Sequence, residues 1–198
     1  MMQQFALLRD RTYRRALDVG CGPGTFTSCL AKICAEVVAL ERSNGALRQA
    51  REALHAVPNV TLISGNIRSY PLPPSSFDLI VLAEVVYYLS FVSGDRRLGV
   101  HPGLASLPPL CRRLREALVP GGRLLMTNYF DLERGPVSRA DVKEFRRLFE
   151  EAGLTVETEY EGLYRRAGAQ QQFQIVLFAA PGAIVPGGAP LNSFPSAP

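Results

Sequence analysis

The stretch RRALDVGCGPGTFTSCLA, residues 14–31, decides the fold because it joins a short apolar run to a segment of helical periodicity. The pattern predicts a buried strand over 15–19 and a helix over 25–34. Three glycines lie between them on alternate positions: Gly20, Gly22 and Gly24. Glycine allows a tight turn and close approach of a ligand, and a helix start favours a negative group by about 0.3–1 kcal/mol. The stretch predicts a nucleotide-like binding turn or, as the alternative, a glycine-rich turn without a ligand.

Strands and helices alternate along the rest of the chain. Further strands are predicted at 36–41, 59–65, 77–89 and 123–130, with a hairpin of two more at 154–162 and 171–180. Helices are predicted at 43–56 with Ser43 or Asn44 as N-cap, from 107 to a stop at Pro120 and Gly121, and at 138–153. Such alternation requires right-handed crossovers. The predicted fold is therefore α/β: a seven-stranded, mostly parallel sheet with a C-terminal antiparallel hairpin and helices on both faces, a three-layer sandwich.

Composition limits the classes of protein. The chain has 198 residues, 47% of them hydrophobic and 20% charged, as in one globular domain. We expect this domain over 1–180 and a disordered, Pro/Gly-rich tail over 181–198. No apolar run reaches the roughly 18 residues of a membrane span, so a cytoplasmic protein is expected. The connection at 90–109 is long enough to be a lid or binding loop.

Charge and cysteine spacing argue against two further kinds of site. The formal net charge is +4, but the arginines are spread over helical segments without interleaved aromatics, so no nucleic-acid site is expected. The four cysteines form no C-x-x-C pair, and no histidine lies at ligand spacing from them. We therefore expect free thiols and no metal.

Two acidic residues restrict the ligand of the glycine turn. Glu41 ends the strand at 36–41, about 20 residues beyond the turn, where an acid can bind both ribose hydroxyls. Asp18 lies inside the first strand, and a buried carboxylate costs several kcal/mol unless it is paired. The alternatives are an exposed acid at a strand end for Glu41 and a cap of the loop amides for Asp18.

The spacing of the turn also discriminates between ligands. A dinucleotide turn reads G-x-G-x-x-G, whereas here Thr25 stands at the third glycine position and Asp18 would repel a pyrophosphate. A ligand that carries an ammonium and a sulfonium suits the turn better. An NAD-dependent oxidoreductase is therefore the less favoured reading.

Several motifs in order resemble a known family. LDVGCGPG with Glu41, GNI at 65–67, FDLIVLAEVVYYL at 77–89 and LVPGGRL at 118–124 resemble class I S-adenosylmethionine-dependent methyltransferases. AEVVYYL and the preceding NVTLISGNI and FDLIV resemble more narrowly the nodulation NodS-type N-methyltransferases, which methylate an amino group on a chito-oligosaccharide. The resemblance implies a Rossmann-like fold, S-adenosyl-L-methionine as cofactor with S-adenosyl-L-homocysteine as product, and a small-molecule acceptor, with nitrogen favoured. It indicates no oligomeric state.

The resemblance also implies roles for particular residues. The implied cofactor-binding residues are Asp18, Gly20, Cys21, Gly22, Gly24, Glu41, Arg42, Asn66, Ile67, Ala83, Glu84 and Val85. The glycine turn would line the methionine part with Asp18 beneath it, Glu41 would bind the ribose, and Arg42 would flank the adenine. Asn66 would meet the adenine at a position where many relatives have Asp; its amide both donates and accepts, so binding is expected to survive.

The candidate catalytic residues are Glu84, Tyr87 and Tyr88. Methyl transfer is an in-line displacement, for which positioning supplies roughly 7–11 kcal/mol. Glu84 could accept a proton or orient an amine, and the tyrosines could hydrogen-bond the acceptor or pack against the cationic methyl. The alternatives are a structural acid bonded to loop amides and an aromatic packing pair.

The N-terminal segment departs from the family. About 13 residues precede the first strand where relatives usually carry a segment that covers the cofactor. MMQQFALLRDR resembles the second half of such a helix, and 90–109 could supply a replacement lid. A non-catalytic or partly truncated cofactor-binding module that acts with a partner is therefore the second hypothesis.

Overall fold

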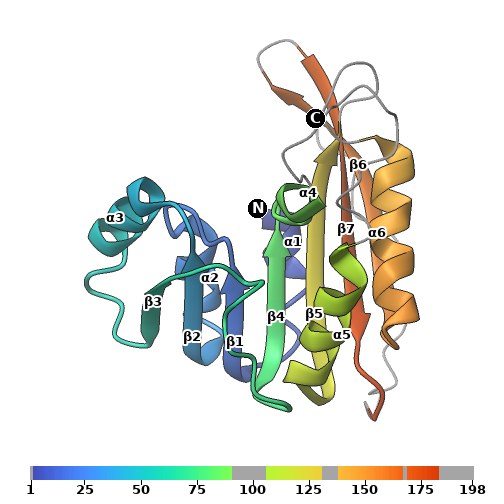
Figure 1. Ribbon diagram of the computed structural model, residues 1–198. Helices are drawn as coiled ribbons and strands as arrows, with labels where there is room; N and C mark the ends of the chain where they lie inside the picture. The colour runs from blue at the N-terminus through green and yellow to red at the C-terminus, as the bar shows by residue number, and fades with distance from the viewer. Residues whose placement is uncertain (1, 91–105, 131–137, 167–168, 183–198) are drawn as a thin grey trace.

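A computed structural model describes residues 2–90, 106–130, 138–166 and 169–182 (Figure 1). The strands are β1 (Tyr13–Val19), β2 (Cys34–Glu41), β3 (Val60–Ser64), β4 (Phe77–Ala83), β5 (Leu118–Phe130), β6 (Thr155–Arg166) and β7 (Ala169–Ala179). The helices are α1 (Met2–Ala6), α2 (Thr25–Leu30), α3 (Asn44–Ala53), α4 (Val86–Ser90), α5 (Leu107–Ala117) and α6 (Arg139–Glu151).

The strands form one seven-stranded sheet in the order β3-β2-β1-β4-β5-β7-β6. Strands β1 to β5 run parallel, and β7 pairs antiparallel with both β5 and β6. This confirms the predicted mostly parallel sheet with its C-terminal hairpin. The strand order reverses between β1 and β4, and ligands of such sheets bind beyond the carboxyl ends of the strands at that point.

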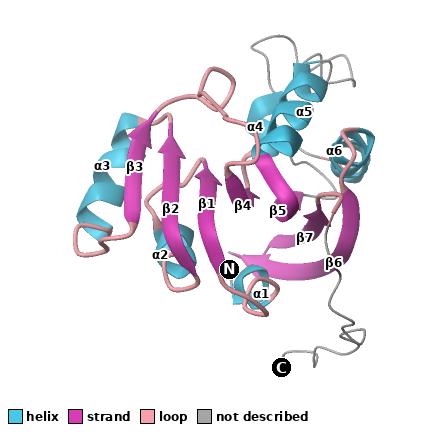
Figure 2. Cartoon of the chain, turned by 90° about the horizontal axis from the view of Figure 1, so that it is seen from below, coloured by secondary structure: helices cyan, strands magenta, loops and turns pink. Residues whose placement is uncertain are grey.

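Helices cover both faces of the sheet, as predicted. Seen along the strands, α1 and α2 lie on one face and α4, α5 and α6 on the other, with α3 at the β3 edge (Figure 2). Two buried clusters follow from this arrangement. One joins Leu8, Phe26 and Leu30 to the sheet, and the other joins α5 and α6 to the opposite face.

The strand predicted at 77–89 is wrong in its second half. β4 ends at Ala83, and residues 86–90 form helix α4. Glu84 has a φ of 59°, in the left-handed region, and this turns the chain out of the sheet. The apolar run VVYYL therefore reflects helix packing rather than a continued strand.

Two helix ends also differ from the prediction. α2 ends at Leu30, and β2 already begins at Cys34. α5 ends at Ala117, and Pro120 lies inside β5. The pairing register shifts there, since Phe77 pairs with Leu118 but Leu79 pairs with Arg123. Such an irregularity accommodates a proline, which cannot donate to a strand ladder.

Helix capping follows the sequence signals. Ser43 accepts a hydrogen bond from the amide of Ala46 at the start of α3. Ser138 and Asp141 form a capping box at the start of α6, and Gly153 follows that helix with a φ of 92°. Most of the predicted connection at 90–109 and nearly all of the predicted tail, residues 91–105 and 183–198, lie outside the described residues.

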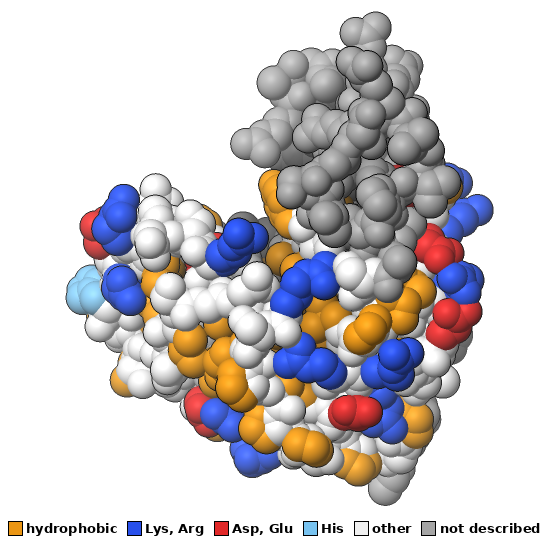
Figure 3. All heavy atoms as spheres, in the orientation of Figure 1, with side chains coloured by type: hydrophobic (Ala, Val, Ile, Leu, Met, Phe, Trp, Pro, Cys, Tyr) orange, Lys and Arg blue, Asp and Glu red, His pale blue; other side chains and the backbone are white. Residues whose placement is uncertain are grey.

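Charged side chains are distributed over the face shown in Figure 3, where basic ones are interspersed with apolar and acidic ones. Within the described parts of the chain, no helix is long and apolar enough to span a membrane. No cluster of three or more His, Cys, Asp or Glu side chains suited to a metal occurs among these same residues.

Candidate functional site

A cavity of about 920 Å³ opens at the carboxyl ends of β1, β2, β3 and β4. Its walls are Val19, Gly20, Gly22, Leu40, Glu41, Arg42, Ser43, Gly65, Asn66, Ile67, Arg68, Glu84, Val85, Tyr88, Leu89 and Ser106. A volume of this size is typical of a site for a small molecule or cofactor. The cavity lies at the edge of the sheet where the topology predicts a ligand.

The glycine turn forms one part of this cavity. Gly20, Gly22 and Gly24 have φ values of 69°, 56° and 84°, which favour glycine at all three positions. A Cβ on Gly20 would lie 2.8 Å from Val85 Cγ2, and one on Gly24 would lie 2.6 Å from Leu54 Cδ1. A Cβ on Gly22 would meet nothing within 4 Å. The outer glycines therefore permit close packing, and Gly22 leaves its backbone open to the cavity.

Glu41 closes the turn from the neighbouring strand. Its Oε2 accepts a hydrogen bond from the Gly22 amide at 2.9 Å, and its Oε1 accepts one from the Ser43 amide at 2.6 Å. The carboxylate is thus fixed at the cavity wall by two backbone donors. This is more constrained than an exposed acid at a strand end, and its role toward a ribose stays a prediction.

Asp18 lies beneath the turn and is only 2% exposed. Its Oδ2 accepts a hydrogen bond from Thr27 Oγ1 of α2 at 2.7 Å, which is a different partner from the loop amides of the alternative reading. Burial raises the pKa of Asp18 to about 6; the Thr27 hydroxyl opposes this shift and the Glu41 charge adds to it. Asp18 therefore supports the turn from below and is not part of the cavity wall.

Cys21 in the turn is buried, and burial together with the Asp18 and Glu41 charges raises its pKa to about 12. It is a free thiol, as are Cys29, Cys34 and Cys111. A thiol with this pKa stays protonated at neutral pH and is a poor nucleophile.

The loop after β3 supplies the next part of the wall. Asn66 and Ile67 line the cavity, and the Asn66 Oδ1 accepts a hydrogen bond from the Arg68 amide at 3.0 Å. The Arg68 guanidinium, which the sequence analysis did not single out, donates to Ser106 Oγ at 2.9 Å and to the Leu89 carbonyl. Arg68 thereby joins the end of α4 to the start of α5 at the cavity.

Glu84 lies where β4 leaves the sheet. Its Oε1 accepts a hydrogen bond from Thr127 Oγ1 at 2.8 Å, and its Oε2 accepts one from the Tyr129 amide at 2.7 Å. Burial raises the pKa of Glu84, while the hydrogen bonds from Tyr129, Thr127 and Tyr87 lower it in part. The carboxylate is a structural acid bonded to β5 and also a wall of the cavity.

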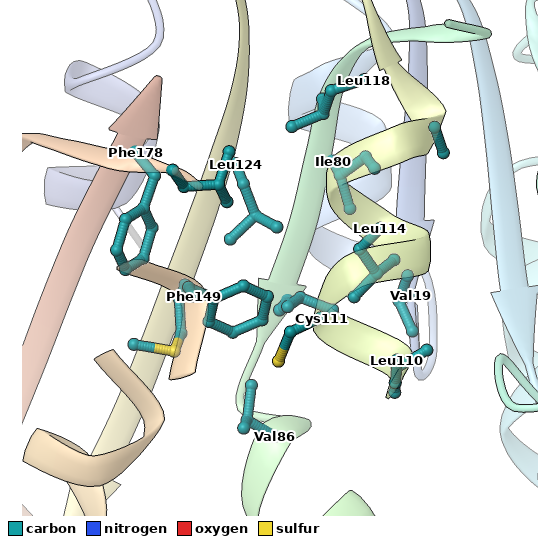
Figure 4. Packing of buried hydrophobic residues seen from close by; sticks show 14 of the residues in the cluster. Val19, Ile80, Val86, Leu110, Cys111, Leu114, Leu118, Leu124, Phe149 and Phe178 are labelled. Carbon is teal, nitrogen blue, oxygen red and sulfur yellow. The ribbon is translucent and has the colours of Figure 1, made fainter. Parts of the chain in front are cut away.

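The two tyrosines lie on α4, with ring centroids 4.5 Å apart. Val86 anchors this short helix, since it points into the cluster that holds Cys111 and Phe149 (Figure 4). Tyr88 is 67% exposed and lines the cavity, whereas Tyr87 packs against the core and burial raises its pKa. Of these two tyrosines, Tyr88 is therefore the one whose side chain is accessible at the cavity wall.

The structure brings most predicted site residues to one cavity. Those that line it are Gly20, Gly22, Glu41, Arg42, Asn66, Ile67, Glu84, Val85 and Tyr88. Those that do not are Asp18, Cys21, Gly24, Ala83 and Tyr87. The wall residues that sequence reasoning missed are Val19, Leu40, Ser43, Gly65, Arg68, Leu89 and Ser106. Six of these adjoin predicted site residues in sequence, but no sequence signal marks Ser106.

Comparison with known proteins decides the family. Residues 17–126, more than half of the chain, match the methyltransferase domain family. The chain belongs to this methyltransferase family. The predicted class of S-adenosylmethionine-dependent methyltransferase is thus confirmed at the level of the family, and the Rossmann-like fold is confirmed with it.

The relatives of this methyltransferase include proteins with different names. Nodulation protein S of Sinorhizobium fredii is 34% identical over 94 residues, which are 48% of this chain and 43% of that protein. Demethylmenaquinone methyltransferase of Lysinibacillus sphaericus is 27% identical over 168 residues, which are 80% of this chain and 68% of that protein. The methyltransferase chain therefore spans less than half the length of the nodulation protein that it matches.

Solved structures confirm the fold. The N-methyltransferase NodS from Bradyrhizobium japonicum superposes with a TM-score of 0.73 at 22% identity, covering 91% of this chain and 93% of that one. The same enzyme in complex with S-adenosyl-L-homocysteine gives a TM-score of 0.68 at 20% identity, with 91% and 86% covered.

Proposed function

We propose that this methyltransferase binds S-adenosyl-L-methionine in the cavity and transfers its methyl group to the nitrogen of a small amine. The observation that carries the proposal is the fixed Glu41 carboxylate. It is bonded to the Gly22 amide of the glycine turn at 2.9 Å and shares one cavity with Glu84. The acid proposed to bind the ribose and a second acid thus face the same space.

The distribution of charge favours a cationic cofactor. Glu41 and Glu84 line the cavity, and Asp18 lies under the turn. The ammonium and sulfonium of S-adenosylmethionine are attracted by these acids, whereas the pyrophosphate of NAD is repelled. In this proposal Glu41 binds the ribose hydroxyls, Arg42 flanks the adenine, and Asn66 offers its amide to the adenine edge.

The glycine turn would hold the methionine part of the cofactor. Gly20 and Gly22 line the cavity, and Cys21 and Gly24 shape the turn behind them. Ile67 would pack against the adenine, and Val85 would lie near the sulfonium. Ala83 would contribute by ending β4 at the reaction centre.

An amine acceptor suits the side of the cavity formed by α4 and the end of β4. The amine lone pair attacks the methyl carbon, the bond from that carbon to sulfur breaks, and its electron pair stays on sulfur to give S-adenosylhomocysteine. Glu84 would orient the amine by its charge, and Tyr88 would offer its ring to the methyl group. Tyr87 would support Glu84 through its hydrogen bond. The N-methyltransferase NodS, which has the same fold, supports nitrogen as the acceptor atom.

Two expectations about partners and location stay predictions. The partner is proposed to be a small molecule and not a nucleic acid or membrane. A cytoplasmic location is expected from the composition.

The first experiment measures cofactor binding by calorimetry. S-adenosylmethionine is expected to bind and NAD to give no heat. Glu41→Gln is expected to weaken S-adenosylmethionine at least tenfold, because a charge-assisted hydrogen-bond acceptor is lost. Glu36→Gln, a change on the same strand in the ion pair with Arg15, is the matched control and should leave binding unchanged. NAD binding instead of S-adenosylmethionine would overturn the proposal.

The second experiment measures transfer of a labelled methyl group to panels of amines, phenols and amino sugars. Transfer to amines is the expected result. Transfer to phenols alone would refute the nitrogen assignment. Cofactor binding without transfer to any panel would favour the non-catalytic module over the enzyme.

A further inference from the structure

Thr127 of β5 is fully buried and is bonded to Glu84 in two ways. Its Oγ1 donates a hydrogen bond to Glu84 Oε1 at 2.8 Å, and its carbonyl accepts one from the Glu84 amide at 3.0 Å. Thr127 pairs in register with Ala83, the last residue of β4. It therefore lies beside the point where Glu84 leaves the sheet.

At that point the Glu84 carboxylate replaces a backbone carbonyl of β4 as the hydrogen-bond acceptor for β5. The φ of 59° turns the chain away after Ala83, so β4 offers no further backbone carbonyl to β5. The Tyr129 amide donates instead to Glu84 Oε2 at 2.7 Å. β5 thus holds both oxygens of the carboxylate and fixes its direction in the cavity.

We propose that Thr127 is a positioning residue for methyl transfer. Its hydroxyl holds the Glu84 carboxylate ionised and oriented so that the lone pairs left on its oxygens accept the proton of an incoming ammonium, which leaves the neutral amine whose lone pair attacks the methyl carbon. This inference rests on the proposed function, because it gives the Glu84 carboxylate a task in binding the acceptor. In the proposed function the cofactor is bound chiefly by residues of β1, β2 and β3 and their loops, whereas β5, which carries Thr127, is separated from β1 by β4.

Burial, hydrogen-bond donors and neighbouring charged groups together set the ionisation of Glu84. Tyr87 of α4 is the titratable side chain that hydrogen-bonds it, and Glu41, Arg42 and Arg68 line the same cavity. Burial raises the pKa of Glu84, and the Thr127 hydroxyl is one of the donors that lower it. Loss of this donor favours the protonated acid, which cannot attract an ammonium.

The experiment compares Thr127→Val, Thr127→Ser and Thr155→Val. Valine keeps the shape but removes the donor, whereas serine keeps the donor. Thr155→Val is the matched control, since its hydroxyl bonds the Ala179 carbonyl at 3.3 Å near the other end of the sheet. The readouts are kcat and KM for the amine as a function of pH, the Kd of S-adenosylmethionine, and a carboxyl-carbon NMR titration of Glu84.

Thr127→Val is expected to lower kcat/KM for the amine roughly tenfold to a hundredfold. The acidic limb of its pH profile and the NMR titration of Glu84 should move up by roughly one pH unit. The Kd of S-adenosylmethionine, whose charges Glu41 and Asp18 also attract, should change by a smaller factor than kcat/KM for the amine. Thr127→Ser should restore both the rate and the pH profile, and Thr155→Val should change neither.

The outcomes separate this inference from the proposed function. An active wild type with an unshifted Glu84 titration in Thr127→Val would overturn the role of Thr127 alone. Equal impairment of the serine and valine variants would also overturn it, because only packing would then matter. A wild type that binds the cofactor but transfers no methyl group would overturn the proposed transfer and with it the positioning role.

Discussion

The glycine turn offers a graded test, because glycines with the same left-handed backbone face different surroundings. An alanine at positive φ costs roughly 1–2 kcal/mol of stability wherever it stands. At Gly22 nothing lies within 4 Å of the added Cβ, so Gly22→Ala is expected to lower the free energy of unfolding by only that amount. At Gly24 the Cβ would lie 2.6 Å from Leu54 Cδ1 and 3.1 Å from its Cγ. Overpacking adds about 1–3 kcal/mol, which gives about 2–5 kcal/mol in total for Gly24→Ala.

Gly153→Ala is the matched control for Gly22→Ala. Gly153 has a φ of 92° and no atom within 4 Å of the added Cβ, and it follows α6 outside the cavity. Both variants should therefore lose the same stability. Only Gly22→Ala should weaken S-adenosylmethionine, by tenfold or more, because Gly22 lines the cavity and its amide fixes Glu41.

Urea unfolding and calorimetry measure the two effects separately. The expected order of stability loss is Gly153→Ala equal to Gly22→Ala and both smaller than Gly24→Ala. If Gly24→Ala were no more destabilising than Gly22→Ala, the packing of the turn against Leu54 would be refuted. If Gly153→Ala weakened the cofactor as much as Gly22→Ala, the loss would come from general destabilisation and not from the turn.

Three further predictions follow from buried groups. Burial raises the pKa of Asp18 from 3.8 to about 6, so ionising it costs stability as the pH rises through this range. In the ligand-free protein, the stability of Asp18→Asn relative to wild type should therefore increase by up to roughly 3 kcal/mol between pH 4 and pH 7 in urea titrations; a constant difference would refute the shift. Asn128 is fully buried, and among the described residues neither of its side-chain polar atoms has a hydrogen-bond partner. Asn128→Leu should raise the free energy of unfolding by about 1–3 kcal/mol, and a loss of stability would point to an unseen partner. Alkylation of the native protein followed by peptide mass spectrometry should label the partly exposed Cys29 before the buried Cys21, whose pKa is raised to about 12, and the reverse order would contradict the packing of the turn.

The periodicity of the chain was enough to predict the sheet and its hairpin, and the cap signal at Ser43 was enough to predict the start of α3. It failed where a single backbone conformation changes the path of the chain. The positive φ of Glu84 ends β4 six residues early, and glutamate carries no sequence signal for that conformation. Pro120 was read as a helix stop, but the register shift in β5 accommodates it inside a strand.

The candidate site likewise has a part that the sequence predicted and a part that only the tertiary fold shows. Glu41 and the glycine turn lie close to β1 and β2, so spacing along the sequence predicted that they would meet. Arg68 and Ser106 meet only through the tertiary fold, since their contact joins segments 38 residues apart. Thr127 was missed because a threonine in an apolar strand is usual. Only its hydrogen bond to Glu84 in the folded protein indicates a role at the site.

This division has a mechanistic consequence. Residues 18 to 68 supply the turn, Glu41 and Asn66, whereas Glu84, Tyr88 and Ser106 come from later elements that β5 and α5 hold in place. In the proposed function the first group contacts the cofactor, and Glu84 and Tyr88 of the second group contact the acceptor. Changes in the first group should therefore act chiefly on the Kd of S-adenosylmethionine, and changes in the second chiefly on kcat/KM for the amine. A second-group variant such as Tyr88→Ala that weakened the cofactor and the acceptor equally would show that the two halves of the cavity bind as one unit.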